Sequence, residues 1–324
     1  MAQASANMKL YVHDVDELND IVSGARLEVV QLRPGMLRAP ISHCCNGALA
    51  IDEGTVNVPL RVRGQLDLRR FSIGLFQPGS EAMFNGNRVD HSRLLFFKPG
   101  RELNGYIRET SGWTSLVFPS DWVDHASQVS DSLRLQAGCG AIRPEAAKLA
   151  RLRAAIDSIK KLSVLQATTP DRTGWLIADL RNALGEAMRE PDGTPSAQAS
   201  HSMGHFNTAQ RAERYMRERM DEPLCIDDLC VILRVSRRYL EYAFNDAFGT
   251  SPSRYLRLLR LHEVRRRLRK PDAPTTVTRE ALRLGFNHLS LFSLQYKKAF
   301  GESPSATLSA RARVPGAAWS YAEP

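Results

Sequence analysis

Two stretches near the end of the chain share one pattern of hydrophobic and polar positions. They span residues 226–249 and 277–301, and each leads into the motif AFG-x-SPS, which recurs at an offset of 52 residues. Upstream of the second helix the offset falls to 51, which indicates a one-residue insertion in the turn of the second copy. Apolar residues at the spacing of a buried helix face are followed, in each copy, by a turn and another such stripe. Each copy therefore predicts a short helix, a tight turn and a second helix.

Cap and turn residues indicate where these helices begin and end. Ser236 and Asn287 are expected to cap the second helix of each copy, and Gly249 and Gly285 are expected to stop a helix. Residues 253–270 are rich in Leu and Arg with no Gly or Pro, so they predict a rigid strut between the copies. A short helix turned into a second helix is the helix-turn-helix, whose second helix lies in the major groove of DNA. The predicted inner stripes of the two second helices are Tyr239, Leu240, Ala243, Phe244 and Ala247, and Leu291, Phe292, Gln295, Tyr296 and Phe300.

The pattern is different between residues 26 and 118, where short alternating or β-rich runs are separated by turn signals. Pro-Gly occurs three times in this region, and Asn85-Gly86 is a hairpin signal. Strands at this density predict an antiparallel sandwich or barrel. The predicted strands lie in residues 27–32, 58–62, 71–76, 94–97 and 114–118.

Helical spacing returns after Pro119, with a helix expected to start at residues 120–123. Residues 144–165 and 173–190 predict two amphipathic helices, which either form a dimer interface or cover the side of the barrel. Residues 191–206 are rich in Gly, Ser and Pro and predict a flexible linker, followed by a helix over 208–220. A short helix is expected near residues 13–18, and a frayed tail after Arg313. The predicted domains are thus 1–190, a linker at 191–206, and 207–313.

The net charge of +9 lies entirely on the last of these domains. Residues 207–313 carry 21 Lys and Arg against 12 Asp and Glu, whereas the rest of the chain carries 23 of each. A concentrated positive charge is typical of a protein that binds a polyanion through its phosphates. Taken alone, the run at 265–270 is also consistent with a solvated helix face.

Several classes of protein are disfavoured by what the sequence contains. No apolar run reaches the ~18 residues of a membrane span, and the first residues lack a signal pattern, so a cytoplasmic protein is expected. Five cysteines without a CxxC pair argue against a disulfide framework or a zinc site. Cys44-Cys45 is either a redox sensor, if one thiol is exposed and its pKa lowered, or a pair of buried inert thiols. The sequence predicts no catalytic residue, no metal, no cofactor and no enzyme.

A barrel of this kind can hold a small molecule in its interior. The aromatic and sulfur-containing residues of the predicted strands, with one histidine, are candidates for lining such a site, and equally for filling the core. His43, His91 and His125 are solitary, which argues against the clustered ligands of a metal-dependent barrel enzyme. The candidate lining residues are Phe76, Met83, Phe84, His91, Phe96, Tyr106 and Trp113.

The paired units, the strut and the repeated FG-x-SPS ending resemble the DNA-binding domain of the AraC/XylS family of bacterial transcription regulators. The resemblance covers about a third of the chain. It implies a seven-helix reader that places one recognition helix in each of two successive major grooves, preceded by a cupin-like jelly-roll domain and dimerisation helices. The sequence departs from the family pattern at Arg234, where a turn usually has Gly, and at Glu280, Leu294 and Thr307-Leu308. Arg234 is therefore expected at positive φ.

Outward positions on the two second helices supply the expected DNA contacts. Arg238 is suited to pair with guanine, and Glu241 to accept from cytosine. Leu289 or Leu294 suits a thymine methyl, but the second unit is interpreted chiefly as a backbone contact through Ser290, Lys297 and Lys298. The full predicted set is Ser236, Arg237, Arg238, Tyr239, Glu241, Tyr242, Asn287, His288, Leu289, Ser290, Leu294, Lys297 and Lys298.

The predicted function is a sequence-specific transcription regulator, chiefly an activator, that contacts double-stranded DNA and RNA polymerase. Its N-terminal domain would sense a small-molecule effector, form a homodimer, or both. Two alternatives are a regulator controlled by a partner protein and a cupin-type enzyme fused to a DNA-binding domain.

Overall fold

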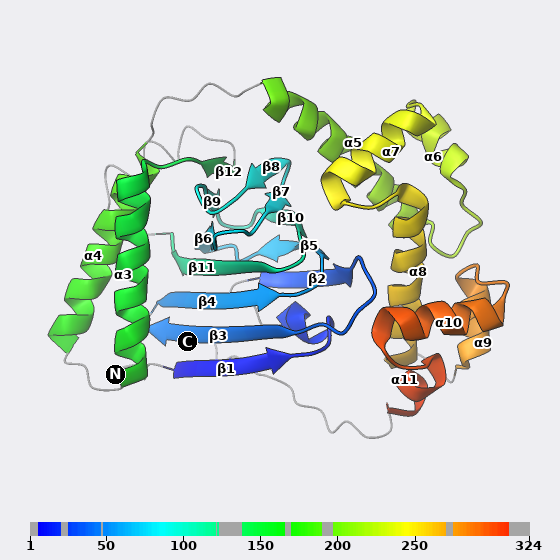
Figure 1. Ribbon diagram of the computed structural model, residues 1–324, viewed down its shortest axis with the longest axis horizontal. Coiled ribbons are helices and arrows are strands. Elements are labelled where there is room, and N and C mark those ends of the chain that lie inside the picture. The colour runs from blue at the N-terminus through cyan, green and yellow to red at the C-terminus, as the bar shows by residue number, and fades with distance from the viewer. Residues whose placement is uncertain are drawn as a thin grey trace.

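The computed structural model describes residues 6–20, 25–46, 48–120, 122, 138–165, 170–189, 197–269 and 275–310. A β-rich N-terminal domain lies beside a helical C-terminal domain (Figure 1). Parts of the helix start predicted at 120–123 and of the linker predicted at 191–206, and the tail predicted after Arg313, lie outside the described residues.

The described strands form two antiparallel sheets, as the sandwich alternative predicts, and they do not close into one barrel. The chain crosses between the sheets, with β2 in one and β1, β3 and β4 in the other. The larger sheet contains, in spatial order, β1 (Ala6–Val12), β3 (Ala39–Asn46), β4 (Leu49–Val56), β11 (Ser111–Pro119), β6 (Arg70–Phe76), β9 (Leu94–Phe97) and β12 (Cys139–Ile142). The smaller contains β2 (Ala25–Gln31), β5 (Leu60–Leu66), β10 (Glu102–Ile107), β7 (Ala82–Phe84) and β8 (Asn87–Val89).

Each of the five predicted strand runs overlaps a strand of these sheets, because alternation and turn residues are read locally. The Asn85-Gly86 hairpin is confirmed: β7 and β8 are joined by these two residues, with φ of 48° and 79°. Both central residues at positive φ match the turn that suits the right-handed twist of a hairpin. The short helix near the N-terminus is a 3-10 turn, η1 (Glu17–Asp20).

Two long helices, α3 (Ala146–Leu165) and α4 (Pro170–Met188), cover the outer face of the larger sheet. Their apolar stripes, including Leu152, Ile156 and Leu180, pack in one core with strand residues such as Phe96 and Phe118. In Figure 1 they lie on the side of the sheet away from the helical domain. The reading in which they cover the side of the sheet domain is thus the one that the packing supports.

The C-terminal domain begins with a helix that is longer than expected. Residues 197–206, assigned to the linker from their composition, are helical and belong to α5 (Ala197–Glu218). The predicted strut is confirmed as α8 (Pro252–Arg269), which stands between the two helix-turn-helix units. The remaining helices are α6 (Ile226–Leu233), α7 (Arg237–Phe248), α9 (Val277–Arg283), α10 (Leu289–Phe300) and α11 (Pro304–Ala310).

Candidate DNA-binding surface and sensor cavity

The turn of the first unit has the geometry that the sequence predicts. Arg234 adopts the left-handed conformation, with φ of 55° and ψ of 46°. Ser236 caps α7, because its side chain accepts a hydrogen bond from the backbone N–H of Tyr239 at 3.2 Å. The left-handed Arg234 ends the first helix and the Ser236 cap begins α7, so together they determine where the second helix starts.

The first turns of α7 present a cationic and aromatic surface. Arg237, Arg238 and Tyr242 are exposed, and Tyr239 is 37% exposed, so its assignment to the inner stripe is wrong. The guanidinium of Arg238 donates to the hydroxyl of Tyr242 at 3.1 Å and lies 5.5 Å from that ring's centroid. This contact holds Arg238 in one orientation before any DNA is bound. Glu241 lies beside it, half-buried.

The second unit begins its recognition helix one residue later than expected. Asn287 does not cap α10; the N-cap is His288, whose side chain makes no capping hydrogen bond. The inserted residue lies in the turn, where Gly285 (φ 81°) takes the left-handed role of Arg234, so the cap falls at the position 52 residues after Ser236. The predicted N-cap, Asn287, is wrong by one residue, because the inserted residue lies before the cap and shifts it to His288.

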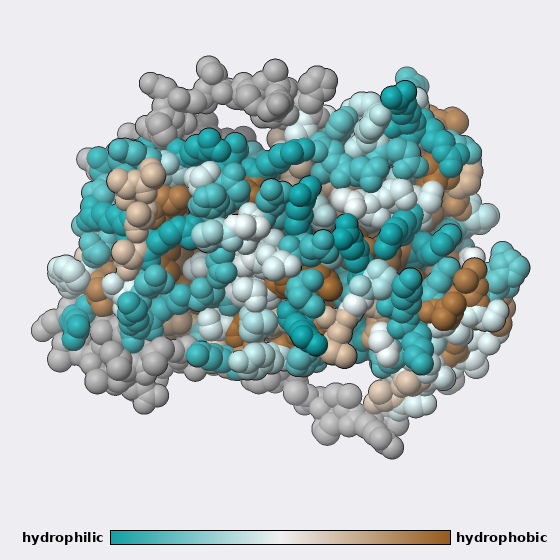
Figure 2. Space-filling model, in the orientation of Figure 1, coloured by the Kyte–Doolittle hydropathy of each residue, from teal (hydrophilic) through white to brown (hydrophobic). Residues whose placement is uncertain are grey.

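The surface of α10 is largely apolar where that of α7 is cationic. Leu289, Leu291 and Leu294 are 36%, 51% and 66% exposed, so Leu291 does not belong to the inner stripe. Figure 2 shows hydrophobic side chains reaching the surface over α9 and α10. Ser290 is exposed among the leucines, and Lys297 and Lys298 are exposed in the last turn. The exposed surface of the first unit is therefore cationic and aromatic, and that of the second unit is mainly apolar.

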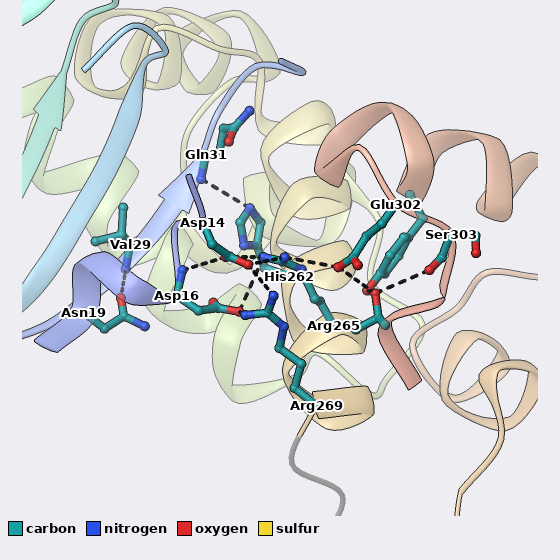
Figure 3. Close-up of polar contacts among 12 residues, drawn as sticks. Asp14, Asp16, Asn19, Val29, Gln31, His262, Arg265, Arg269, Glu302 and Ser303 are labelled. Atoms are coloured by element: carbon teal, nitrogen blue, oxygen red, sulfur yellow. Dashed lines mark hydrogen bonds and ion pairs between the residues drawn. The ribbon is translucent and has the colours of Figure 1, made fainter. Parts of the chain in front are cut away.

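Two arginines of the basic run, Arg265 and Arg269, pair with carboxylates of the N-terminal domain, whereas Arg266 is exposed as on a solvated helix face. Arg265 is 5% exposed and binds Asp14 at 2.6 Å, and Arg269 binds Asp16 at 2.7 Å and also Asp14 (Figure 3). Burial alone would raise the pKa of Asp14, but the hydrogen bonds and charges of the two arginines outweigh it and lower the pKa to about 2. These arginines fasten the strut to the N-terminal domain.

A second contact between the domains is centred on a buried ion pair. Arg61 on β5 and Glu213 on α5 meet at 2.5 Å, and neither is more than 2% exposed. Glu213 also accepts hydrogen bonds from Tyr255 at 2.6 Å and Arg217 at 3.1 Å. Burial favours the neutral acid, yet the guanidinium charges of Arg61 and Arg217 and the phenol of Tyr255 hold the pKa of Glu213 at about 2.

An apolar cavity of about 120 Å³ lies between the two sheets. Of the seven residues proposed to line such a site, Phe76, Phe84 and Trp113 do so. The other four point elsewhere: Phe96 lies in the core under α3 and α4, Met83 and Tyr106 pack toward the helical domain, and His91 is exposed. Sequence reasoning missed the aliphatic lining of the smaller sheet, which includes Leu27, Val29, Leu60, Val62 and Ile107.

The smaller sheet is a wall shared by the cavity and the helical domain. Along β2, Val29 lines the cavity, whereas Val30 packs in the core of the helical domain, and the backbone N–H of Gln31 donates to His262 of the strut at 3.2 Å. The same alternation along β5 sends Val62 inward and Arg61 to Glu213. Side chains alternate across a strand, so each of these strands touches both sites.

Neither a metal site nor a membrane-spanning helix is found in the described ranges. Within them, no group of three or more His, Cys, Asp or Glu residues is arranged to hold a metal ion. No described helix is long and apolar enough to cross a membrane.

Comparison with known proteins places the similarity in the helical domain. A family model described as a helix-turn-helix domain matches residues 229–310. The probable thc operon regulatory protein of Rhodococcus erythropolis is 36% identical over 95 residues, or 29% of each chain. The XylDLEGF operon transcriptional activator of Pseudomonas putida is 34% identical over 100 residues, or 31% of each chain. The chain thus spans under a third of the length of these relatives.

A similar solved structure is a transcriptional regulator from Chromobacterium violaceum, described by its AraC-type DNA-binding domain. It is 33% identical, with a TM-score of 0.32, and the match covers 35% of this chain and 98% of that one.

Proposed function

We propose that this chain, whose helical domain is similar to the DNA-binding part of AraC/XylS-type transcription regulators, binds a promoter sequence through both helix-turn-helix units and activates transcription. The observation that carries this proposal is the exposure of the first turns of both α7 and α10, the helices that follow the two turns. In this fold class the second helix of each unit enters a major groove. The two units on one strut then occupy successive grooves, and RNA polymerase is the partner of the bound activator.

The two units divide the work of recognition. Arg238, already oriented by Tyr242, pairs with guanine through its two-pronged donor set, and Glu241 accepts from cytosine. On α10, Leu289 and Leu294 contact thymine methyl groups or leave the unit bound to the backbone, through Ser290 and the two lysines. The first unit therefore supplies most of the sequence selectivity.

The N-terminal domain would sense a small apolar effector in the cavity between its sheets. The cavity is lined almost entirely by hydrocarbon side chains. An apolar cavity of roughly 150 Å³ in another protein stays dry and admits benzene, so a single aromatic ring or a short hydrocarbon is the ligand class that fits. Support for coupling to DNA comes from β2 and β5, whose alternate side chains face the cavity and the helical domain.

Self-association is part of the proposal. Trp175 on α4 is 66% exposed, on a helix whose other face is buried against the larger sheet. A homodimer through α3 and α4 would cover it. Light scattering of the full chain distinguishes a dimer from a monomer, and Trp175→Ala should weaken a dimer that uses this face.

Two experiments test these proposals separately. Footprinting on promoter DNA at increasing salt should show two protected grooves about one helical turn apart, with affinity falling as salt rises. Thermal shift of the full chain against single-ring aromatics and short hydrocarbons should reveal a stabilising ligand. Val117→Phe, which fills the cavity, should abolish that shift, whereas Thr114→Val, on the opposite face of β11, should preserve it.

The alternative of a partner-controlled regulator makes the opposite prediction. If DNA is bound but no apolar compound stabilises the wild type, the effector proposal fails and control by a partner protein is favoured. The full chain is needed, because residues 1–190 alone would expose Val30 and Leu32, which are buried against the helical domain.

A further inference from the structure

The larger sheet carries a thiol, an imidazole and a carboxylate in hydrogen-bonded order. His43 Nε2 lies 2.8 Å from Cys45 Sγ, and His43 Nδ1 lies 2.6 Å from Asp52 Oδ1. His43 and Cys45 are two residues apart on β3, so both project from one face, and His43 is paired in register with Asp52 on β4. A nucleophile, a base within hydrogen-bond reach and a group that orients the base form the arrangement that activates a nucleophile.

The sheet fixes the roles of the three groups. Asp52 is 1% exposed, and its carboxylate accepts from Nδ1, which leaves Nε2 to exchange a proton with the thiol. The hydrogen bonds to Asp52 and then to Cys45 raise the pKa of His43 to about 10, against the opposing effect of burial. A protonated imidazole beside sulfur stabilises the thiolate, which is the reactive form of cysteine.

Access separates Cys45 from its neighbour. Cys45 is partly exposed, whereas Cys44 projects from the opposite face of β3 and is buried in the core under α3 and α4. Cys225 is the exposed thiol of the described residues and lies at the start of α6, in the other domain. Of the two neighbouring thiols, Cys45 is therefore the accessible one.

We propose that Cys45 is a modification site at which His43 and Asp52 activate the thiol toward small hydroperoxides. In the reactive form the proton shared by the thiol and the imidazole lies on His43 Nε2, and the thiolate of Cys45 attacks the terminal oxygen of the peroxide. The S–O bond forms as the O–O bond breaks, and the leaving oxygen takes the proton back from Nε2. Sulfur loses two electrons and the peroxide gains them, so thiol and hydroperoxide give sulfenic acid and water or an alcohol.

The product should persist until an external thiol reduces it. Cys44 faces the other side of the strand and is not placed to attack the sulfenic acid of Cys45. A small thiol such as dithiothreitol, supplied in solution, would first form a mixed disulfide and then restore Cys45. A sulfenic acid that an added thiol reduces at one cysteine differs from a structural disulfide, which would link two cysteines of the chain.

The test uses the full chain and one internal reference. The protein is pulsed with hydrogen peroxide at neutral pH in the presence of dimedone, and each cysteine is quantified by peptide mass spectrometry. Cys45 should be trapped as the sulfenic-acid adduct about tenfold faster than Cys225, which is more exposed but has no such histidine contact among its described neighbours. His43→Asn should bring Cys45 down to the rate of Cys225 or below, and Asp52→Asn should give an intermediate rate.

Two results would overturn the proposal. One is a wild-type Cys45 that reacts no faster than Cys225, a comparison that needs no variant and does not depend on variant folding. The other is a His43→Asn protein with a wild-type melting curve and an unchanged Cys45 rate. Neither result bears on DNA binding or on the effector cavity.

Discussion

Replacing Glu213 by Gln tests whether a buried charge holds the two domains together. The amide keeps the size of the side chain and can still accept hydrogen bonds, but Arg61 and Arg217 lose the charge that faces them. Arg61 has no exposed surface, so water cannot take over that role. Breaking a buried ion pair from one side costs about 3–5 kcal/mol.

The lowered pKa of Glu213 leads to a similar magnitude. A carboxyl whose pKa falls from 4.5 to about 2 on folding stabilises the folded state, by roughly 3 kcal/mol at neutral pH. Because the folded pKa is the lower one, this stabilisation is present above pH 4.5 and is lost as the pH falls toward 2. Both routes lead to a loss of about 3 kcal/mol for Glu213→Gln at pH 7.

The assay is urea unfolding of the full chain, with Glu28→Gln as the matched control. Glu28 pairs with the same Arg217, at 2.5 Å, but its side chain is 52% exposed. Exposed pairs contribute about 0–1 kcal/mol, so the control should lose no more than that. Equal losses for Glu213→Gln and Glu28→Gln would refute the reasoning. So would additive losses in the Arg61→Met/Glu213→Gln double variant, since contacting residues should couple.

Three further outcomes are expected. Arg238→Ala should lower affinity for the chosen promoter by about 1–3 kcal/mol in gel shifts, and Leu294→Ala should lower it less; the reverse ranking would make α10 the dominant reader. His262 is half-buried, and its ring accepts a hydrogen bond from the backbone N–H of Gln31. Desolvation lowers the pKa of His262 to about 3, so stability should fall below pH 6.5 as the histidine of the unfolded chain binds its proton. His262→Gln should flatten that fall in melting curves recorded at several pH values, and an unchanged slope would contradict it. Gly249→Ala should lower the melting temperature more than Gly301→Ala does. Both glycines end a helix in the left-handed conformation, but a Cβ at Gly249 would lie 2.2 Å from the Tyr106 hydroxyl, whereas a Cβ at Gly301 would have nothing within 4 Å. Equal melting temperatures would show that the Tyr106 side chain moves aside without cost.

Features encoded by neighbours in the sequence were predictable. The repeat located both helix-turn-helix units, and the caps, left-handed turns and hairpin follow from the conformations that single residues prefer. Alternation located the strands. Where the signal shifted by one residue, as at Asn287 and His288, the prediction shifted as well.

Features that depend on residues far apart in the chain were not predictable. Nothing in the local pattern tells that Arg61 meets Glu213, or that the arginines of the strut meet Asp14 and Asp16. A basic run looks the same whether it faces phosphate, water or a carboxylate. The family departures at Glu280 and Thr307 involve partners nearer in the chain: Thr275 donates to Glu280 at 2.5 Å, and Tyr296 donates to Thr307 at 2.9 Å.

The shared sheet sets an energetic condition on any effector. Val29 and Val62 face the cavity, while Val30 and Arg61, their neighbours, face the helical domain, so a ligand that moves the first pair also moves the second. In the docked arrangement Arg61 pairs with Glu213, and leaving either group buried without the other would cost about 3 kcal/mol. To release that contact, a ligand must bind the undocked arrangement roughly a hundredfold more tightly than the docked one. A ligand that merely fills the cavity in both arrangements would stabilise the protein without changing its affinity for DNA.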